Sequence, residues 1–353
     1  MGVFVTNNIA RLKRFKENNV NYVYICFGEL DTEAQRLLDK FSYDKIDTRG
    51  YSESFKEEFA LAYIDLLGHL GAKLNSIYWW ASFTASKNRF MSKLLPTLLD
   101  YYTVCNTIKN NPARSIILIS PPRSVIHAIK HFCIQNSIEL KSLDSPITEG
   151  FLRIKDGIIH FQEIIKFILK NWVKIFIVKM LFRNCLLEDC TQESFYVLRT
   201  WVYESSISKD NKFSDSFFGR LPEFLTARNK KVIVLAGIVN NYGNTIKRLS
   251  KCNEKYLIVP QEYFLKFSDV VKIAIDVYFS KIRLTNKIKL YEFDVTKIIQ
   301  GELDRNCRET IYIRTELLQK YIIKNMLKHF SINTFTTTYE NNPWERICIL
   351  FLR

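Results

Sequence analysis

Short apolar runs rich in β-branched and aromatic residues alternate with longer amphipathic segments through the first part of the chain. Residues 21–27 and 115–120 are the clearest such runs, and residues 76–80 predict a further strand. Helices are predicted over residues 32–41, from about 53 to 70, and over 124–136. Buried strands that alternate with helices favour a parallel sheet covered on both faces. We therefore predict an N-terminal Rossmann-like α/β domain over residues 1–145.

The same alternation returns in the second half of the chain, which predicts a second α/β domain over residues 191–353. The fold class predicted from the whole pattern is α/β, with two Rossmann-like parallel-sheet units. The strands of the second unit are predicted within residues 193–203, at 231–236, at 256–259 and at 333–337, and its helices at 221–228, 269–283, 310–330 and from Trp344 onward.

The segment between these domains predicts a helical linker over residues 146–190. Residues 141–160 are polar and rich in turn formers, which favours a boundary, and residues 161–183 predict one continuous helix. This helix carries Lys166, Lys170 and Lys174 four residues apart among apolar side chains. Such a helix can lie in a membrane interface with its lysines toward anionic headgroups. The alternative is a connecting helix packed on a neighbouring domain.

Charge and cysteine content narrow the classes of partner. The 353 residues carry 51 Lys and Arg against 36 Asp and Glu, a net charge of +15, which favours an anionic partner. The basic residues are scattered, which speaks against nucleic acid. The eight cysteines form no Cys-x-x-Cys pair, so no metal site is expected, and they suit a reducing, cytoplasmic environment. The sequence holds no run of about 18 uncharged apolar residues that would predict a membrane span.

The segment 338–346 is the strongest candidate for chemistry. It groups aromatic, acidic, amide and basic side chains around Pro343, between a predicted strand and a predicted helix. Sugar and nucleotide sites use aromatic faces for stacking and carboxylates or amides for hydroxyl groups. The alternative is a helix-start loop with a buried tryptophan. The candidate site residues here are Tyr339, Glu340, Asn341, Trp344, Glu345 and Arg346.

Two further segments place polar residues after a predicted strand that carries tryptophan. The first spans residues 79–88 and the second spans residues 200–222. Ligands of doubly wound sheets bind at the carboxyl ends of strands, so both segments are candidate binding sites. The alternative for the first is that its tryptophans are core residues and the rest is a helix cap. The candidate residues are Trp80, Ser82, Lys87 and Asn88 in the first segment, and Trp201 and Asp215 in the second.

The loop at residues 237–244 follows a predicted buried strand and precedes a helix. Its backbone N–H groups could bind an anion. A tight turn between strand and helix is the alternative.

Three motifs, in chain order the first at residues 79–88, the second at 200–222 and the third at 339–345, resemble a bacterial surface-carbohydrate biosynthesis family. This family is found in O-antigen gene clusters of Leptospira type, and the resemblance covers roughly residues 20–350. The resemblance implies a two-domain glycosyltransferase of the GT-B kind that uses a nucleotide sugar as donor and needs no metal or other cofactor. From residue type and position, Glu340 and Glu345 are candidates for the base or a sugar-hydroxyl ligand, and Lys87 and Arg346 are candidates for phosphate charge. Trp80, Trp201 and Trp344 are candidates for stacking or wall residues. The motif at residues 79–88 departs from the family in having Ser86 where an acid is expected.

The family pattern continues beyond the Pro-Trp-Glu motif, whereas this sequence ends at Arg353. The resemblance therefore implies a further C-terminal domain or a separate subunit, and little transferase activity without it. We also expect Trp80, Trp201 and residues 339–345 to border one cleft, because strand ends in parallel sheets gather at one edge.

The predicted function is glycosyl transfer to a lipid-linked or glycan acceptor in surface polysaccharide, O-antigen or lipopolysaccharide assembly. The protein would be cytoplasmic and peripheral on the anionic surface of the inner membrane. Two alternatives remain open. The first is a non-catalytic glycan- or membrane-binding member of the same pathway, and the second is a basic nucleic-acid-binding protein.

Overall fold

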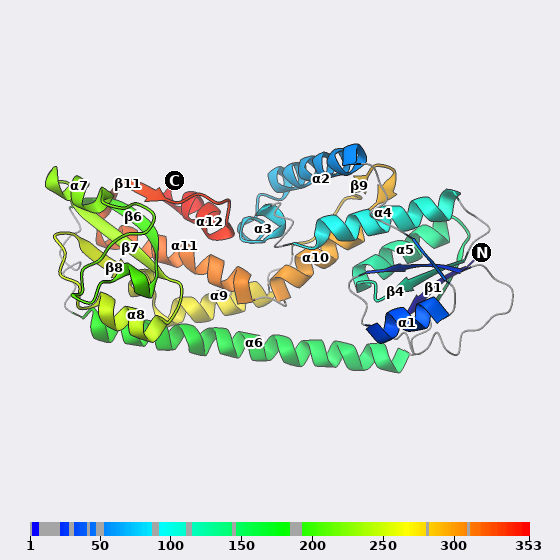
Figure 1. Cartoon of the computed structure of the whole chain (residues 1–353), viewed down its shortest axis with the longest axis horizontal. Helices are drawn as coiled ribbons and strands as arrows, with labels where there is room; N and C mark the ends of the chain where they lie inside the picture. Colours follow the sequence, from blue (N-terminus) through cyan, green and yellow to red (C-terminus); the bar gives the residue numbers. More distant parts are fainter. Residues whose placement is uncertain are drawn as a thin grey trace. The chain divides into compact units, whose positions relative to one another are not determined.

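The computed structural model of the chain describes residues 2–6, 22–27, 32–40, 43–46, 53–86, 92–110, 115–142, 146–183, 193–279, 282–308 and 311–353. The protein is an α/β protein with two all-parallel sheets, of five and four strands, each alternating with helices (Figure 1). The chain forms two compact units, Met1–Phe161 with Lys281–Glu309 and Gln162–Ser280 with Thr310–Arg353. The predicted fold class is confirmed.

The sheet of the first unit has the strand order β3-β2-β4-β1-β5. Its centre is the fully buried β4, which pairs in parallel with β2 and β1. The elements of this unit are β1 (Gly2–Thr6), β2 (Tyr22–Cys26), α1 (Thr32–Lys40), β3 (Asp44–Lys45), α2 (Glu53–Leu74), α3 (Ile77–Trp80), the 3-10 turn η2 (Thr84–Ser86), α4 (Leu94–Asn110), β4 (Ser115–Ile119), α5 (Arg123–Gln135) and β5 (Glu139–Ser142), and later β9 (Lys289–Leu290), β10 (Phe293–Asp294) and α10 (Thr296–Arg308).

The two faces of this sheet are covered differently. One face packs with α2, α4, α5 and α10 in a large apolar core, which includes Ile116 and Leu118 of β4. The alternate residues Ile117 and Ile119 turn to the other face, where Leu38 of α1 lies. This alternation follows from the two-residue period of a strand.

Residues 282–308 belong to the first unit, although the sequence analysis placed them in the second domain. Phe293 and Ile299 lie in the core of the first unit, and α10 packs closely on α5, where a Cβ on Gly301 would stand 2.3 Å from Cβ of Ser124. The sequence prediction assumed contiguous domains, and a chain that leaves a domain and returns to it carries no local signal of that path.

The sheet of the second unit has the strand order β11-β6-β7-β8. The strand β6 lies between β11 and β7 and is paired in parallel with both. The elements are α6 (Pro146–Leu181), within which the division between the units falls, β6 (Ser194–Val202), η3 (Glu204–Ser206), α7 (Leu221–Ala227), β7 (Val232–Ile238), α8 (Tyr242–Leu249), β8 (Leu257–Pro260), η4 (Gln261–Phe264), α9 (Phe267–Phe279), α11 (Ile311–His329), β11 (Ser331–Thr337) and α12 (Pro343–Leu352).

Alternate residues of β6 also separate the two faces of the second sheet. Leu198 and Val202 pack with α6 and α8 in one apolar core. On the other face, Phe195 packs against Phe330, the residue that follows α11, with ring centroids 4.9 Å apart. Trp201 packs there against Trp344 of α12. The helices α11 and α12 thus cover the face that carries Trp201.

One local prediction is wrong. Residues 76–80 form no strand, because Ser76 caps the helix α3 by accepting a hydrogen bond from the backbone N–H of Tyr78, 3.3 Å away, and Trp79 is buried in the core. The segment predicted as a helical linker, residues 146–190, contains the helix α6, which begins at Pro146 shortly after β5 ends at Ser142. The continuous helix predicted over 161–183 is confirmed as the second half of α6.

Candidate binding site at the carboxyl edge of the second sheet

The order of strands places a topological switch point between β6 and β11. From β6 the chain adds β7 and then β8 on one side, and β11 afterwards pairs with the other side of β6. In open parallel sheets the crevice outside the carboxyl ends of the strands at this point is where ligands bind. The segments that leave this edge are the turn that follows Val202 and the loop that follows Thr337.

The loop after β11 is held by the carboxylate of Glu345. Asn342 is the N-cap of α12 and forms a capping box with Glu345. The Glu345 carboxylate accepts hydrogen bonds from the backbone N–H of Glu340 at 3.1 Å, from the backbone N–H of Asn342 at 2.9 Å and from the Asn342 side-chain amide at 3.2 Å. Glu345 is completely buried. Its carboxylate fixes the loop and does not face solvent.

Other side chains of the loop point outward. Tyr339 and Glu340 are exposed, and the Glu340 carboxylate accepts one hydrogen bond from the side-chain amide of Asn342, at 3.2 Å. Arg346 donates to the backbone carbonyl of Asn341 at 3.2 Å and to its side-chain oxygen at 3.1 Å. Burial lowers the pKa of Arg346 to about 10, so it stays cationic at neutral pH. The loop therefore presents an aromatic ring, a carboxylate and a guanidinium together.

Behind the loop, the guanidinium of Arg199 lies in the angle between two indole rings. Its central carbon is 3.8 Å from the ring centroid of Trp201 and 3.9 Å from that of Trp344. The two rings meet edge to face, with centroids 5.5 Å apart. A Cβ on Gly237 of the neighbouring strand would stand 2.7 Å from Nη2 of Arg199, so a glycine at this position makes room for the guanidinium. Cation–π contacts with both rings stabilise this arrangement.

The charge of Arg199 is only partly compensated. Arg199 is 1% exposed, and burial lowers its pKa to about 10. Nη2 donates to the side-chain oxygen of Gln261 at 3.4 Å, whereas Nε and Nη1 have no hydrogen-bond partner among the described residues. Buried N–H donors without a hydrogen-bond partner destabilise a folded protein. An apolar side chain in place of Arg199 would fill this space without that destabilisation.

Glu316 of α11 is a carboxyl group of this site whose pKa is raised toward neutral pH. Burial raises its pKa from 4.5 to about 7, against the lowering effects of the Arg199 charge and of a hydrogen bond from the backbone of Trp344. A carboxyl group with a pKa near the working pH can both take up and release a proton. Glu316 is therefore chemically suited to acid–base work beside the loop.

A second polar cluster lies at the ends of β6 and β7. The Glu204 carboxylate accepts hydrogen bonds from the side-chain amides of Asn241, at 2.6 Å, and Asn244, at the start of α8. Arg248 lies 3.7 Å from the same carboxylate. An acid at a helix N-terminus is favoured by the helix dipole. The protein's own carboxylate thus lies beside residues 237–244, where an external anion was one of the two alternatives that the sequence left open.

The second and third motifs of the sequence analysis meet here, through the contact of Trp201 with Trp344. Asp215 lies on the other face of β6, where Oδ1 accepts hydrogen bonds from the Thr200 hydroxyl at 3.0 Å and from the backbone N–H groups of Phe217 and Phe218. Its Oδ2 is buried without a hydrogen-bond partner among the described residues. Asp215 shapes the loop after η3 and is not part of the tryptophan cluster.

The first motif lies in the first unit, and its residues do not follow a strand as predicted. Trp80 ends the helix α3 and packs against the core of the first unit. Ser82 is buried, donating to the carbonyl of Trp79 at 2.7 Å and accepting from the backbone N–H of Ala85 at 3.2 Å. These bonds form the turn between α3 and η2. Lys87 and Asn88 lie outside the described residues.

Sequence reasoning missed Arg199 and Glu316. Arg199 is the charged residue within the buried strand β6, two residues before Trp201 and therefore on the same face of the strand. A charged residue inside a buried strand was the available signal. Glu316 has no comparable signal, because a glutamate in a long amphipathic helix is ordinarily solvated.

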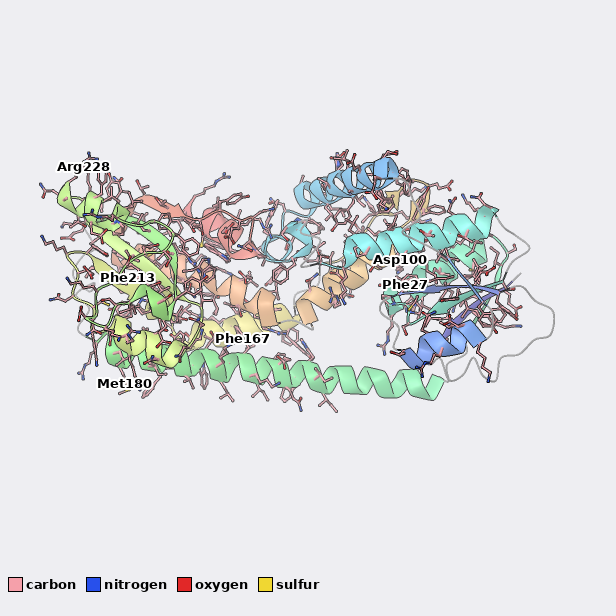
Figure 2. All side chains as sticks on the ribbon, in the orientation of Figure 1. Phe27, Asp100, Phe167, Met180, Phe213 and Arg228 are labelled. Carbon is pink, nitrogen blue, oxygen red and sulfur yellow. The ribbon has the colours of Figure 1, made fainter. Side chains whose placement is uncertain are left out.

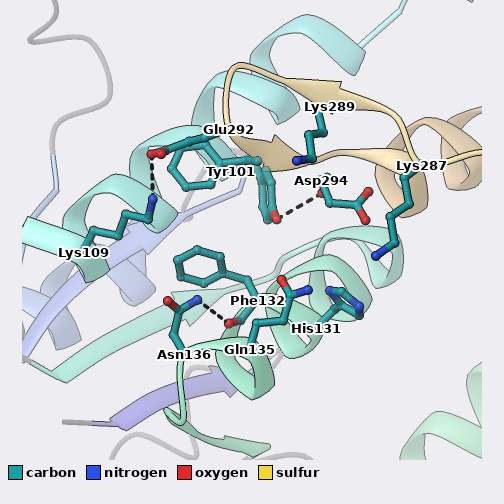
Figure 3. A pocket seen from close by; sticks show the side chains of 11 residues that line it. Tyr101, Lys109, His131, Phe132, Gln135, Asn136, Lys287, Lys289, Glu292 and Asp294 are labelled. Carbon is teal, nitrogen blue, oxygen red and sulfur yellow. Dashed lines mark hydrogen bonds and ion pairs between the residues drawn. The ribbon is translucent and has the colours of Figure 1, made fainter.

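The first unit contains a cavity of about 350 Å³ beside the ends of α4 and α5 (Figure 3). Lys109 pairs with Glu292 at 2.8 Å, and the Tyr101 hydroxyl donates to the backbone carbonyl of Asp294 at 3.2 Å. Burial raises the pKa of Asp294, but hydrogen bonds from Thr296 and nearby positive charges outweigh it, so the pKa is lowered. Lys109 belongs to the last turn of α4, where the helix dipole favours a cation. The lining residues are Tyr101, Lys109, His131, Phe132, Gln135, Asn136, Lys287, Lys289, Glu292, Phe293 and Asp294.

Comparisons of the chain with protein-family models, with curated proteins and with solved structures found no match. In the part of the chain that the structure describes, no three His, Cys, Asp or Glu side chains are grouped to hold a metal ion. Within the same described ranges, no helix has the length and apolar character needed to cross a membrane.

Proposed function

We propose that this protein transfers a glycosyl group from a nucleotide sugar to a glycan or lipid-linked acceptor in bacterial surface polysaccharide assembly. Two Rossmann-like units in one chain support the proposal, because GT-B glycosyltransferases use a pair of such units. The three motifs that resemble the O-antigen biosynthesis family support it as well.

The observation that carries the proposal is the position of the loop formed by residues 338–342. It leaves the sheet at the switch point between β6 and β11, where nucleotide ligands of doubly wound sheets bind. Tyr339, Glu340 and Arg346 offer an aromatic face, a carboxylate and a cation there. The aromatic face suits stacking on a base or sugar ring, the carboxylate suits sugar hydroxyl groups, and the cation suits a diphosphate.

In the proposed reaction the acceptor hydroxyl attacks the anomeric carbon of the donor, and the bond from that carbon to the phosphate oxygen breaks. The nucleoside diphosphate leaves with the bonding electron pair, and a general base takes the acceptor proton. Glu340 is the exposed candidate base, and Glu316 is the second, since its pKa is raised to about 7. Arg346 and the deeper Arg199 supply positive charge for the departing diphosphate.

The test is release of nucleoside diphosphate by the full chain from UDP-, GDP-, CDP- and dTDP-linked sugars, with and without an extract of bacterial lipid-linked glycans. We expect slow release from one nucleotide class that depends on the extract, in keeping with the low activity expected from the sequence. Glu340→Gln should lower kcat by about 100-fold if Glu340 is the base. Exposed Glu57→Gln on α2 is the matched control. Absence of release with every donor, together with absence of binding, would refute the proposal.

A non-catalytic glycan-binding role is the second candidate. It is favoured by Glu345, one of the two carboxylates predicted to be catalytic, because its oxygens are bound to the N–H groups of its own loop. This role predicts saturable binding of a nucleotide sugar or glycan without release of nucleoside diphosphate.

A further inference from the structure

The helix α6 carries an apolar stripe that is exposed along the second unit. The side chains of Ile165, Leu169, Val173, Phe176 and Met180 are 40%, 55%, 57%, 58% and 64% exposed. Their spacing of three or four residues places them on one side of the helix. Large apolar side chains are normally scattered singly over a surface, so a continuous row of them indicates a surface that another apolar phase covers.

The opposite side of α6 already supplies the packing that the second unit requires. Phe167, Ile175 and Val178 are buried, and Asn171 between them donates to the backbone carbonyl of Phe167 at 2.8 Å. Figure 2 shows Phe167 on the side of α6 nearest α9, and Met180 on the other side. The exposed stripe therefore takes no part in the core of the second unit.

The stripe continues from α6 onto α9. The indole N–H of Trp172 donates to the backbone carbonyl of Phe267 at 3.2 Å, and the two rings meet edge to face with centroids 5.9 Å apart. Both side chains are exposed. Trp172 thus combines an apolar ring with a satisfied polar group, as tryptophans at membrane interfaces do. Further exposed apolar side chains of α9 are Ile275, Tyr278 and Phe279.

Lysines flank the stripe. Lys166 and Lys170 lie on one border and Lys179 on the other, all exposed, and the ammonium of Lys179 lies 5.8 Å from the Phe267 ring centroid. Lys166 forms a surface ion pair with Glu163 at 2.8 Å, and Lys174, the third lysine of the predicted row, pairs with buried Glu262 at 3.4 Å. Long lysine side chains beside an apolar stripe can reach lipid phosphates while the stripe enters the acyl boundary.

We infer that α6 is a membrane-interface helix whose apolar stripe enters the surface of an anionic bilayer, with Lys166, Lys170 and Lys179 at the headgroups. A second copy of the same helix would bring lysine rows together, because Glu163 is the one acid whose side chain the structure describes on α6. Charge complementarity therefore favours anionic lipid over self-association. No described helix could span the membrane, so α6 would lie along the surface. The inference deepens the proposed function, since a lipid-linked acceptor is held in that membrane.

The inference is tested by flotation of the full chain with vesicles of phosphatidylcholine alone and of phosphatidylcholine with phosphatidylglycerol. We expect flotation with the anionic vesicles, weakened at high salt, and a loss of about tenfold or more in bound fraction for Leu169→Glu/Phe176→Glu. The matched control Leu61→Glu/Ile134→Glu changes two exposed apolar residues of the first unit and should float like the wild type. Because flotation needs no donor or acceptor, its outcome is independent of transferase activity.

A charge-matched pair tests the lysines. Lys166→Glu/Lys170→Glu should weaken flotation with anionic vesicles, whereas Lys247→Glu/Lys251→Glu, with the same net charge on exposed positions of the second unit, should weaken it much less. Equal flotation of the wild type and the Leu169→Glu/Phe176→Glu variant would overturn the inference. So would a homodimer, seen by light scattering, that the same double substitution dissociates, since it would assign the stripe to self-association.

Discussion

The guanidinium carbon of Arg199 lies 3.9 Å from the ring centroid of Trp344. This contact joins the middle of the central strand β6 to the first turn of α12, and so to the loop at the switch point. Burial lowers the pKa of Arg199, and two of its nitrogens have no hydrogen-bond partner among the described residues. The arrangement has a stability cost, and such costs are characteristic of functional sites.

We predict that Arg199→Met leaves the free energy of unfolding unchanged or raises it by about 1 kcal/mol, because an unbranched apolar side chain between the indoles needs no hydrogen bonds. Nucleotide-sugar affinity should fall about tenfold as the positive charge is lost. Denaturant titration and calorimetric binding measure the two effects. Arg228→Met is the control, since Arg228 stacks on Phe224 at 3.8 Å far from the switch point. A destabilisation above about 3 kcal/mol would show that Arg199 is mainly structural.

Gly237→Ala should destabilise the second unit by about 1 to 3 kcal/mol, since the new Cβ would stand 2.7 Å from Nη2 and 3.0 Å from Cζ of Arg199. The measurement is the midpoint of urea unfolding. Gly243→Ala on α8 is the control: nothing lies within 4 Å of its Cβ position, and alanine favours the helix, so stability should be equal or higher. Equal effects of both substitutions would mean that the space beside Arg199 is not tight.

Glu345→Ala should destabilise the protein by about 1 to 3 kcal/mol, because it leaves the N–H groups of Glu340 and Asn342 without their acceptor. Glu340→Ala, at an exposed position of the same loop, should change stability by less than about 0.5 kcal/mol and reduce activity instead. Thermal unfolding and diphosphate release separate the two roles. A Glu345→Ala variant that folds normally but loses all activity would restore Glu345 as a catalytic candidate.

Glu316 should make stability depend on pH. Its pKa is raised from 4.5 to about 7 in the folded protein, so the folded state holds the proton more tightly than the unfolded chain. The stabilisation is complete below the unfolded pKa and is lost as pH rises through the folded one. Between about pH 5 and pH 8, the free energy of unfolding of the wild type should fall by about 1 to 3 kcal/mol relative to that of Glu316→Gln. Parallel stability curves for the two proteins would contradict the raised pKa.

The parts of the fold that could be predicted from the sequence are those where burial leaves a local pattern. The strands β4 and β7 are apolar apart from Ser115, and both were predicted within two residues of their ends. The short strands β3 and β5 are mostly exposed and carry no such pattern. The return of residues 282–308 to the first unit depends on contacts between distant segments, which no window of sequence shows.

The candidate site was predicted in part for a similar reason. Residue type singled out the loop 338–346, and the strand-end rule placed Trp201 near it. In the structure Trp201 contacts Trp344. The same rule failed for Trp80, because the aromatic pair that suggested a strand forms a short helix. Residue type also could not separate exposed Glu340 from buried Glu345, since their difference arises from the capping box.

The measurement that tests the central claim most directly is titration of the full chain with UDP-, GDP-, CDP- and dTDP-linked sugars, followed by intrinsic tryptophan fluorescence. The account predicts saturable binding of one nucleotide class, weakened about tenfold or more by Tyr339→Ala or Arg346→Ala and unchanged by Tyr278→Ala at an exposed position of α9. Absence of saturation with every donor, or equal affinities of the wild type and both loop variants, would contradict a nucleotide-sugar site at the switch point between β6 and β11.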